Sequence, residues 1–289
     1  MPDLLELVIE PRPRDLGGFS VGRVLPAPMR RALGPFVFLD HMGPVGFGPG
    51  HGFDVRPHPH IGLATVTSLF EGEVMHRDSL GSVQTIRPGE LNWMTAGRGI
   101  VHSERSPDAL RASGARLHGL QLWVALPLAH EECEPDFQHV EGDALPSFEL
   151  DGVPLRLLAG SAYGKSAQVR VHSPLFYLHV KLAAGQRIAL PDEYAERGAY
   201  IVSGSVEAAG SVHAARRLLV FRPGHAELIA QEPTRLALLG GDALDSPRHI
   251  EWNFVSSSRE RIELAKQAWR ERRFPIIPTD AEEFIPLPS

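Results

Sequence analysis

Short apolar segments, each ended by a Pro/Gly turn, recur along the whole chain and limit it to a fold of many short strands. Glycine (28 residues) and proline (25 residues) mark these turns and interrupt the 289-residue sequence too often for long helices. Segments 63–70, 90–94, 120–126, 200–202 and 217–221 are rich in apolar residues and stop at such turns. This spacing predicts an all-β sandwich or barrel.

A faint internal repeat indicates two such barrels in tandem. The sequence FEGE at 70–73 leads to RPGE at 87–90, and VSGS at 202–205 leads in the same way to RPGH at 222–225. The copies lie about 130–135 residues apart, which is the length of a typical domain. We predict a first barrel in residues 1–130, an acidic, proline-containing linker in 131–154, a second barrel in 155–250, and a helix and tail in 251–289.

One segment near the C-terminus has helical periodicity instead. Ser257 and Glu260 have the spacing of a capping box, and Ile262, Ala265 and Trp269 then fall on one helical face. The basic residues of this segment would suit a partner protein or a nucleic acid, but three glutamates interleave them. We therefore favour a helix that docks on a barrel and leaves its outer face in solvent.

The composition argues against several classes of partner. The net charge is −6, from 29 basic and 35 acidic residues, so the chain is a poor candidate for binding nucleic acid or an anionic membrane. It has no run of ~18 apolar residues, and its N-terminus does not resemble a secretory signal. A single cysteine, Cys133, fits a reducing compartment. We expect a cytoplasmic monomer.

Two pairs of metal-ligand residue types stand on β-type segments. His58 and His60 form one pair, and His102 and Glu104 form the other. On a strand, side chains i and i+2 point to the same face, so neighbouring strands would bring four ligands to one point inside a barrel. Imidazole and carboxylate suit Fe, Mn, Ni or Zn, and four protein ligands on a six-coordinate ion would leave two open positions.

A chance His-x-His pair is the alternative explanation, because the chain contains 14 histidines. Two i,i+2 pairs on β-type segments are much harder to explain by chance, and the lack of cysteine ligands argues against structural zinc. We interpret His41, His51 and His76, which lie near the first pair, as ordinary core or surface histidines.

Several longer motifs resemble those of the pirin family. They are GPFVFLDHMGP at 34–44, PHPH at 57–60, LFEG at 69–72, HRDSLG at 76–81, WMTAGRGIVHSE at 93–104 and HGLQLWV at 118–124. The resemblance is strongest from about residue 16 to residue 126 and thinner over the second half. It implies a bicupin, that is, two antiparallel cupin barrels, with a short C-terminal helix in this chain.

The resemblance also implies the ligand set. The family's three histidines and one glutamate fall on His58, His60, His102 and Glu104, in agreement with the pattern of the residues. In the second half, the equivalent positions near 190–192 and 236–238 carry no such pair, so we expect one metal site and a mainly structural second barrel. Ile61 and Ala64 replace the family's usual Arg and Glu, and we expect them to make the pocket wall more apolar.

The function implied is that of a metal-dependent dioxygenase similar to quercetin 2,3-dioxygenase. The substrates would be a flavonol or similar enol and dioxygen, Glu104 would act as general base, and the metal would be Fe(II), with Ni, Mn, Zn or Cu as alternatives. A second hypothesis is an iron-dependent redox sensor that binds a transcription factor or a metabolic enzyme. A third is a structural bicupin whose metal only holds the barrel together.

Overall fold

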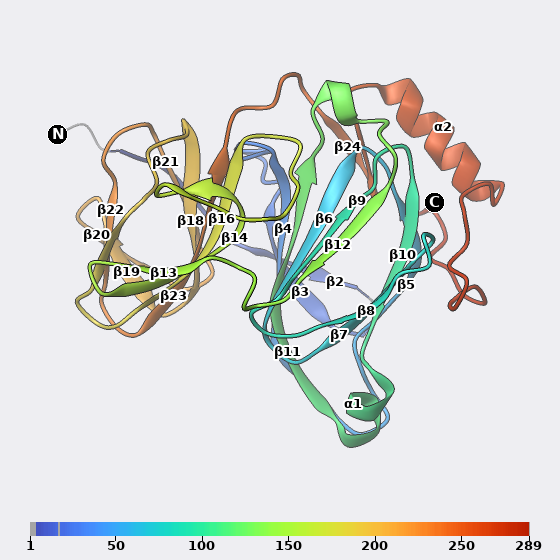
Figure 1. The fold of residues 1–289 in the computed structure, drawn as a ribbon, viewed down its shortest axis with the longest axis horizontal. Coiled ribbons are helices and arrows are strands. Elements are labelled where there is room, and N and C mark those ends of the chain that lie inside the picture. Colours follow the sequence, from blue (N-terminus) through green and yellow to red (C-terminus); the bar gives the residue numbers. More distant parts are fainter. Residues whose placement is uncertain (1–3, 17, 289) are drawn as a thin grey trace. The chain divides into compact units, whose positions relative to one another are not determined.

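The structure, a computed structural model, describes residues 4–16 and 18–288. Strands dominate it, which confirms the all-β prediction (Figure 1). The chain divides into two compact units: unit 1 comprises Met1–Pro13, Gly22–Leu39 and Asp143–Ala243, and unit 2 comprises Arg14–Val21, Asp40–Gly142 and Leu244–Ser289. Within the described ranges, no helix is long and apolar enough to span a membrane.

Unit 1 is built from two antiparallel sheets. The larger contains β1 (Leu5–Ile9), β13 (Ser147–Leu150), β14 (Val153–Ala162), β15 (Lys165–Ser166), β16 (Leu175–Leu182), β18 (Glu196–Ser203), β21 (Leu218–Phe221) and β23 (Thr234–Gly241). Its strand order is β1-β21-β18-β23-β16-β14-β13, and β15 pairs with β14. The smaller contains β17 (Arg187–Ala189), β19 (Ser205–Ala208), β20 (Ser211–Ala214) and β22 (Glu227–Ala230), in the order β17-β22-β19-β20.

The core of unit 1 is apolar at the positions where a second metal site would lie. Leu190, Leu236 and Leu238 are buried within one hydrophobic cluster, together with Phe176 and Ile201. Leucine offers no metal ligand, and burying its side chain stabilises the folded state by about 1.5–3 kcal/mol. The packing therefore supports the expectation that this barrel has a structural role.

Unit 2 holds most of a larger sheet and all of a smaller one. The larger contains β2 (Arg12–Asp15), β3 (Ser20–Leu25), β4 (Phe36–Phe47), β6 (Leu63–Glu71), β9 (Leu91–Thr95), β11 (Ala115–Ala125) and β12 (Asp136–Val140), in the order β12-β9-β6-β11-β4-β3-β2. The smaller contains β5 (Asp54–His60), β7 (Val74–Asp78), β8 (Val83–Ile86) and β10 (Ile100–Arg105), in the order β5-β10-β7-β8. The remaining elements are α1 (Asp108–Ser113), the 3-10 turn η1 (Leu128–His130), the pair β24 (His249–Glu251) and β25 (Phe254–Ser256), and α2 (Arg259–Arg270).

The interior of unit 2 is apolar in one part and polar in another. Thr65, Thr67 and Leu69 alternate on β6 and therefore share one face. Leu69 packs in an apolar cluster, whereas Thr67 lies opposite Gln121 of β11 and Thr65 opposite Trp123. The polar part of this interior contains the predicted ligand residues.

The unit boundaries differ from the predicted linear domains. β1 pairs with β21, so the N-terminal strand belongs with the later barrel rather than with residues 1–130. The predicted linker 131–154 contributes strands: β12 pairs with β9, and β13 pairs with β14. The prediction of a linker was wrong because edge strands that extend a sheet need little apolar sequence of their own.

The C-terminal helix forms as predicted, with a different cap. Ile262 and Ala265 are buried, and Trp269 packs against the same cluster, which confirms the predicted apolar face. The N-cap is Ser258, whose side chain accepts a hydrogen bond from the backbone N–H of Arg261. The predicted cap, Ser257, instead donates from its Oγ to Glu131 Oε2 over 2.7 Å.

We expect Ser258→Ala to reduce the free energy of unfolding of unit 2 by about 1 kcal/mol, because the first turn of α2 loses its acceptor. Ser258→Asn, which retains a capping oxygen, should stay close to the wild type. Tryptophan fluorescence during urea unfolding measures this selectively, since all 4 tryptophans (Trp93, Trp123, Trp252 and Trp269) lie in unit 2. Equal losses in both variants would contradict the assignment of Ser258 as the cap.

Candidate metal centre

Three of the four predicted ligands gather at one point inside unit 2. His58 and His60 lie on β5, His102 lies on the neighbouring β10, and the antiparallel register sets His102 opposite His58. All three side chains are buried. Each offers a ring nitrogen, and these nitrogens lie within 4.8 Å of one another. The i,i+2 alternation on β5 explains why both of its histidines face the same interior.

Hydrogen bonds fix the orientation of two of the rings. His58 Nδ1 lies 2.8 Å from the carbonyl oxygen of Arg56, and His60 Nδ1 lies 3.0 Å from that of Asn253. A carbonyl oxygen can only accept, so each Nδ1 carries the hydrogen and donates it. In a neutral ring, the Nε2 atoms of His58 and His60 then keep their lone pairs free for an ion.

Burial keeps these rings neutral. It lowers the pKa of His58 to about 4, although the Arg56 carbonyl opposes the shift. Burial, followed by the charge of His58, also holds the pKa values of His60 and His102 well below the usual value. Neutral imidazole is the form that binds metal ions.

The spacing of the nitrogens fits a metal ion. His60 Nε2 and His102 Nε2 are 3.1 Å apart. Neighbouring ligands at a right angle on an ion with bonds of ~2.1 Å would be ~3 Å apart. In addition, His102 Nδ1 is buried with no hydrogen-bond partner among the described residues, so the polar contact of this ring is the one that its Nε2 makes with His60. The donor set of three buried imidazoles therefore fits a divalent transition metal.

Glu104 lies close to this group but outside its tightest part. It follows His102 by two residues on β10 and is buried, and its Oε1 accepts a hydrogen bond from Thr67 Oγ1 over 3.1 Å. Within the described residues, the set with all ligand atoms inside 4.8 Å contains the three histidines and leaves out Glu104. The register of the β5–β10 pair shifts between His102 and Glu104.

On the β7 side of β10, Glu104 is paired in register with His76. Burial raises the pKa of Glu104, while the charge of His76 and the Thr67 hydrogen bond oppose the rise. A carboxylate with a raised pKa is a better proton acceptor near neutral pH than an exposed one. The geometry thus suits Glu104 to proton transfer next to the histidines.

The other histidines near the first pair take separate places. His76 Nε2 lies 3.0 Å from Asp78 Oδ2, and its ring stacks on Phe137. His41 Nε2 lies 2.8 Å from His118 Nε2, and His51 is exposed. None of His41, His51 and His76 belongs to the close metal-ligand group, in agreement with their interpretation as core or surface residues.

The structure corrects the expected role of Ile61 and Ala64. Ile61 packs against Phe254 and α2 in a separate apolar cluster, not against the histidines. Ala64 alternates with Thr65 on β6, so it faces away from the interior that Thr65 shares with Trp123. The expectation that both residues line the pocket was wrong, because Ile61 packs against β25 and α2 and Ala64 lies on the other face of β6.

Several site residues were missed by sequence reasoning. Thr67 and Gln121 face the site from the larger sheet, and the carbonyl of Asn253 holds His60 although 193 residues separate them. The Trp123 ring meets the His60 ring edge-on at 5.2 Å between centroids. Only the alternation of polar residues on the strand 63–70 could have indicated Thr67.

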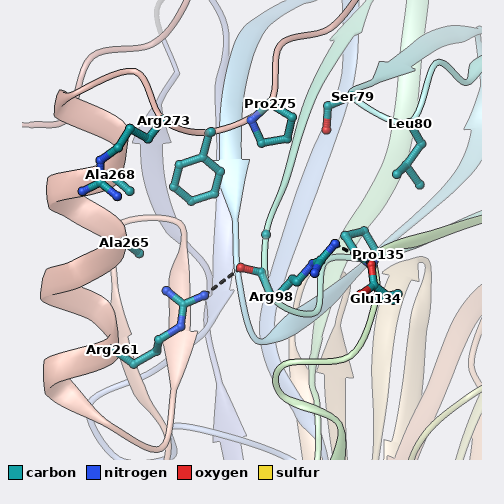
Figure 2. Close-up of a pocket in the computed structure, with 12 residues that line it drawn as sticks. Ser79, Leu80, Arg98, Glu134, Pro135, Arg261, Ala265, Ala268, Arg273 and Pro275 are labelled. Carbon is teal, nitrogen blue, oxygen red and sulfur yellow. Dashed lines mark hydrogen bonds and ion pairs between the residues drawn. The ribbon is translucent and has the colours of Figure 1, made fainter.

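A groove of about 460 Å³ lies on the outer side of unit 2, between α2 and the loops that precede β10 and β12. Figure 2 shows Arg98, Arg261 and Arg273 around it, with the Arg261 guanidinium donating to the Arg98 carbonyl oxygen over 2.7 Å. Arg98 also pairs with Glu134 at 2.7 Å. The three histidines do not line this groove, so it is separate from the candidate metal centre.

Comparison with known proteins decides the family. The Pirin family model matches residues 18–124, and the model described as the Pirin C-terminal cupin domain matches residues 177–275. A pirin-like protein of Caulobacter vibrioides is 53% identical over 290 aligned residues, which cover 99% of this chain and 100% of the relative. The chain belongs to the pirin family. The prediction of two cupin domains is thereby confirmed, and β5 and β10 of this pirin both lie in the first matched region.

Solved structures of pirin-like fold agree. The crystal structure of quercetin 2,3-dioxygenase from Acinetobacter baumannii has a TM-score of 0.90 and 34% identity, covering 98% of this chain and 95% of that one. The bacterial pirin YhhW from Escherichia coli, solved in complex with nickel(II), has a TM-score of 0.65 and 21% identity, covering 82% of this chain and 99% of that one. The second likeness shows the shared fold alone.

Proposed function

We propose that this pirin binds one divalent metal ion through His58, His60, His102 and Glu104 and uses it to oxygenate a flavonol or similar enol with dioxygen. The observation that carries the proposal is the group of three buried, neutral imidazoles with nitrogens within 4.8 Å of one another. The likeness to a protein named quercetin 2,3-dioxygenase, at 34% identity over nearly the whole chain, supports the reaction class. We propose Fe(II) as the ion, with Ni, Mn, Zn or Cu as the alternatives.

A bound divalent ion would supply Lewis acidity and a template for substrate oxygens. The protein's own residues move the proton and position the substrate. Glu104, with its raised pKa, accepts the proton of the substrate hydroxyl, and Thr67 holds the carboxylate in place through its hydroxyl donor. Trp123 gives the site an aromatic wall beside His60, which suits a flat, conjugated substrate.

Oxygen uptake tests this proposal directly. Protein loaded anaerobically with ferrous iron should consume dioxygen when quercetin is added and should not do so without it. Glu104→Gln keeps the shape of the side chain but removes the base, and we expect it to lower the rate by about 100-fold or more. Glu73→Gln, a partly exposed glutamate of the same unit that pairs with Arg87, is the matched control. Unchanged uptake in Glu104→Gln would refute the role of Glu104 as base.

A second candidate function is a redox sensor that binds a partner protein. The observation that favours it is the outer groove, which reaches Gly99 immediately before β10, the strand of His102. A change in the charge of the bound metal ion would therefore be transmitted along β10 and alter the conformation of this surface. Hydrogen exchange in the ferrous and the ferric protein tests it: protection that differs at 98–101 and 261–275 supports a sensor, and identical protection contradicts it.

A further inference from the structure

The segment after α2 contacts both ligand strands of unit 2 from outside. The backbone N–H of Ile285 donates to the Pro57 carbonyl oxygen on β5 over 2.8 Å. Ser103 Oγ on β10 donates to Asp280 Oδ2 over 2.8 Å. Trp269 of α2 in turn donates from Nε1 to the Ile285 carbonyl oxygen over 3.0 Å. The segment is therefore tied at one end to the helix and along its length to the strands that carry the three histidines.

Asp280 makes the strongest of these contacts. On β10, His102 and Glu104 face the interior, so Ser103 and Arg105 between and after them face outward. Arg105 Nε donates to Asp280 Oδ2 over 2.8 Å and Nη2 donates to Oδ1 over 3.0 Å, which is a bidentate pair. Such pairs fix direction as well as distance. Asp280 thus holds the two outward residues that flank Glu104.

The ladder between β5 and β10 is weak at this place. His102 lies opposite His58 and Glu104 opposite Val55, so between these pairs one residue of β10 faces two residues of β5. Pro57 and Pro59 lack a backbone N–H and cannot donate to a neighbouring strand. A cavity of about 50 Å³, lined in part by Pro57 and Asp280, lies beneath the C-terminal segment. On its other side β10 keeps an unbroken register with β7 from His102 to Arg105, so the irregular edge is the one toward β5. The polar contacts of Asp280 supplement the ladder at that edge.

We propose that Asp280 is a positioning residue for the metal centre: through Ser103 and Arg105 it sets where β10 presents His102 and Glu104 to the histidines of β5. The inference rests on the proposed metal-binding function. A second contact from the C-terminal region acts on the same site: the Asn253 carbonyl oxygen accepts a hydrogen bond from His60 and orients its ring directly. Groups that hydrogen-bond the ligands themselves commonly change metal affinity by about 10–100-fold when removed, and Asp280 acts on the ligands through the backbone of β10.

Cobalt(II) titration of the full-length apoprotein tests the proposal, because the visible absorption bands of the bound ion report its coordination geometry. Asp280→Ala should weaken Co(II) binding by about 10-fold or more in chelator competition and should change the absorption bands. Asp280→Asn keeps an acceptor for Ser103 and loses the charged pair, so its effect should be smaller. Ser103→Ala, which removes one hydroxyl group, should act in the same direction even if Asp280→Ala fails to fold.

Glu283→Gln is the matched control. Glu283 lies on the same segment and contacts Arg105 at 2.9 Å, but its side chain is 55% exposed, against 13% for Asp280. This variant should keep the wild-type affinity and spectrum. Wild-type affinity and bands in Asp280→Asn and Ser103→Ala would overturn the positioning role alone. Failure of the unmodified protein to bind Co(II) would instead overturn the metal-binding function on which it rests.

Discussion

His102→Ala should leave this pirin with less than about a tenth of the metal that the wild type retains. His102 lies opposite His58 in the strand register, and its Nε2 lies 3.1 Å from His60 Nε2. Its ring centroid is 4.4 Å from that of His58 and 5.0 Å from that of His60, so it is in contact with both other donors. The loss of a direct ligand should exceed the ~10–100-fold loss of affinity that follows removal of an outer contact.

Metal content after dialysis against a weak chelator measures this effect. His51→Ala is the matched control, because His51 is an exposed histidine of the same unit and should leave the metal content unchanged. Circular dichroism verifies that both variants keep their strands. One ion per chain retained by His102→Ala would contradict the assignment of His102 as a ligand.

Gly62→Ala should reduce the free energy of unfolding of unit 2 by about 3 kcal/mol or more. Gly62 has φ of +67°, a conformation that costs an L-residue about 1–2 kcal/mol. A Cβ atom at this position would lie 2.0 Å from the Val255 carbonyl oxygen, so β25 would have to move. The backbone of Gly62 also donates to the Gly97 carbonyl oxygen and accepts from the Leu126 N–H, which leaves the loop little freedom to adjust.

Gly81→Ala separates the cost of the left-handed backbone conformation from the cost of the clash with the Val255 carbonyl oxygen. Gly81 has φ of +92°, but a Cβ atom there would meet no atom within 4 Å. This variant should therefore lose only the conformational part, about 1–2 kcal/mol. Urea unfolding, monitored by tryptophan fluorescence, compares the stability of unit 2 in the two variants. Equal losses in Gly62→Ala and Gly81→Ala would show that β25 accommodates the methyl group without cost.

Much of the fold could be predicted because it depends on local periodicity. Short apolar segments between turns predict strands wherever they lie, and the face formed by Ile262, Ala265 and Trp269 predicts α2. The linker could not be predicted correctly, because β12 and β13 are edge strands whose partners β9 and β14 decide their structure. The cap of α2 was misplaced by one residue because Glu131, distant in sequence, engages Ser257.

For the site, the sequence by itself determined that His58 and His60 share one face and that His102 and Glu104 share another, because side chains alternate along any strand. It also determined that the second barrel has leucine at 236 and 238, where ligands would be needed. Only the tertiary structure decided that Glu104 falls outside the set of ligand atoms that lie within 4.8 Å of one another, because distances between strands depend on their pairing. It likewise decided that Asp280 reaches Ser103 across 177 residues, a contact that no local pattern encodes because it arises from the path of the folded chain.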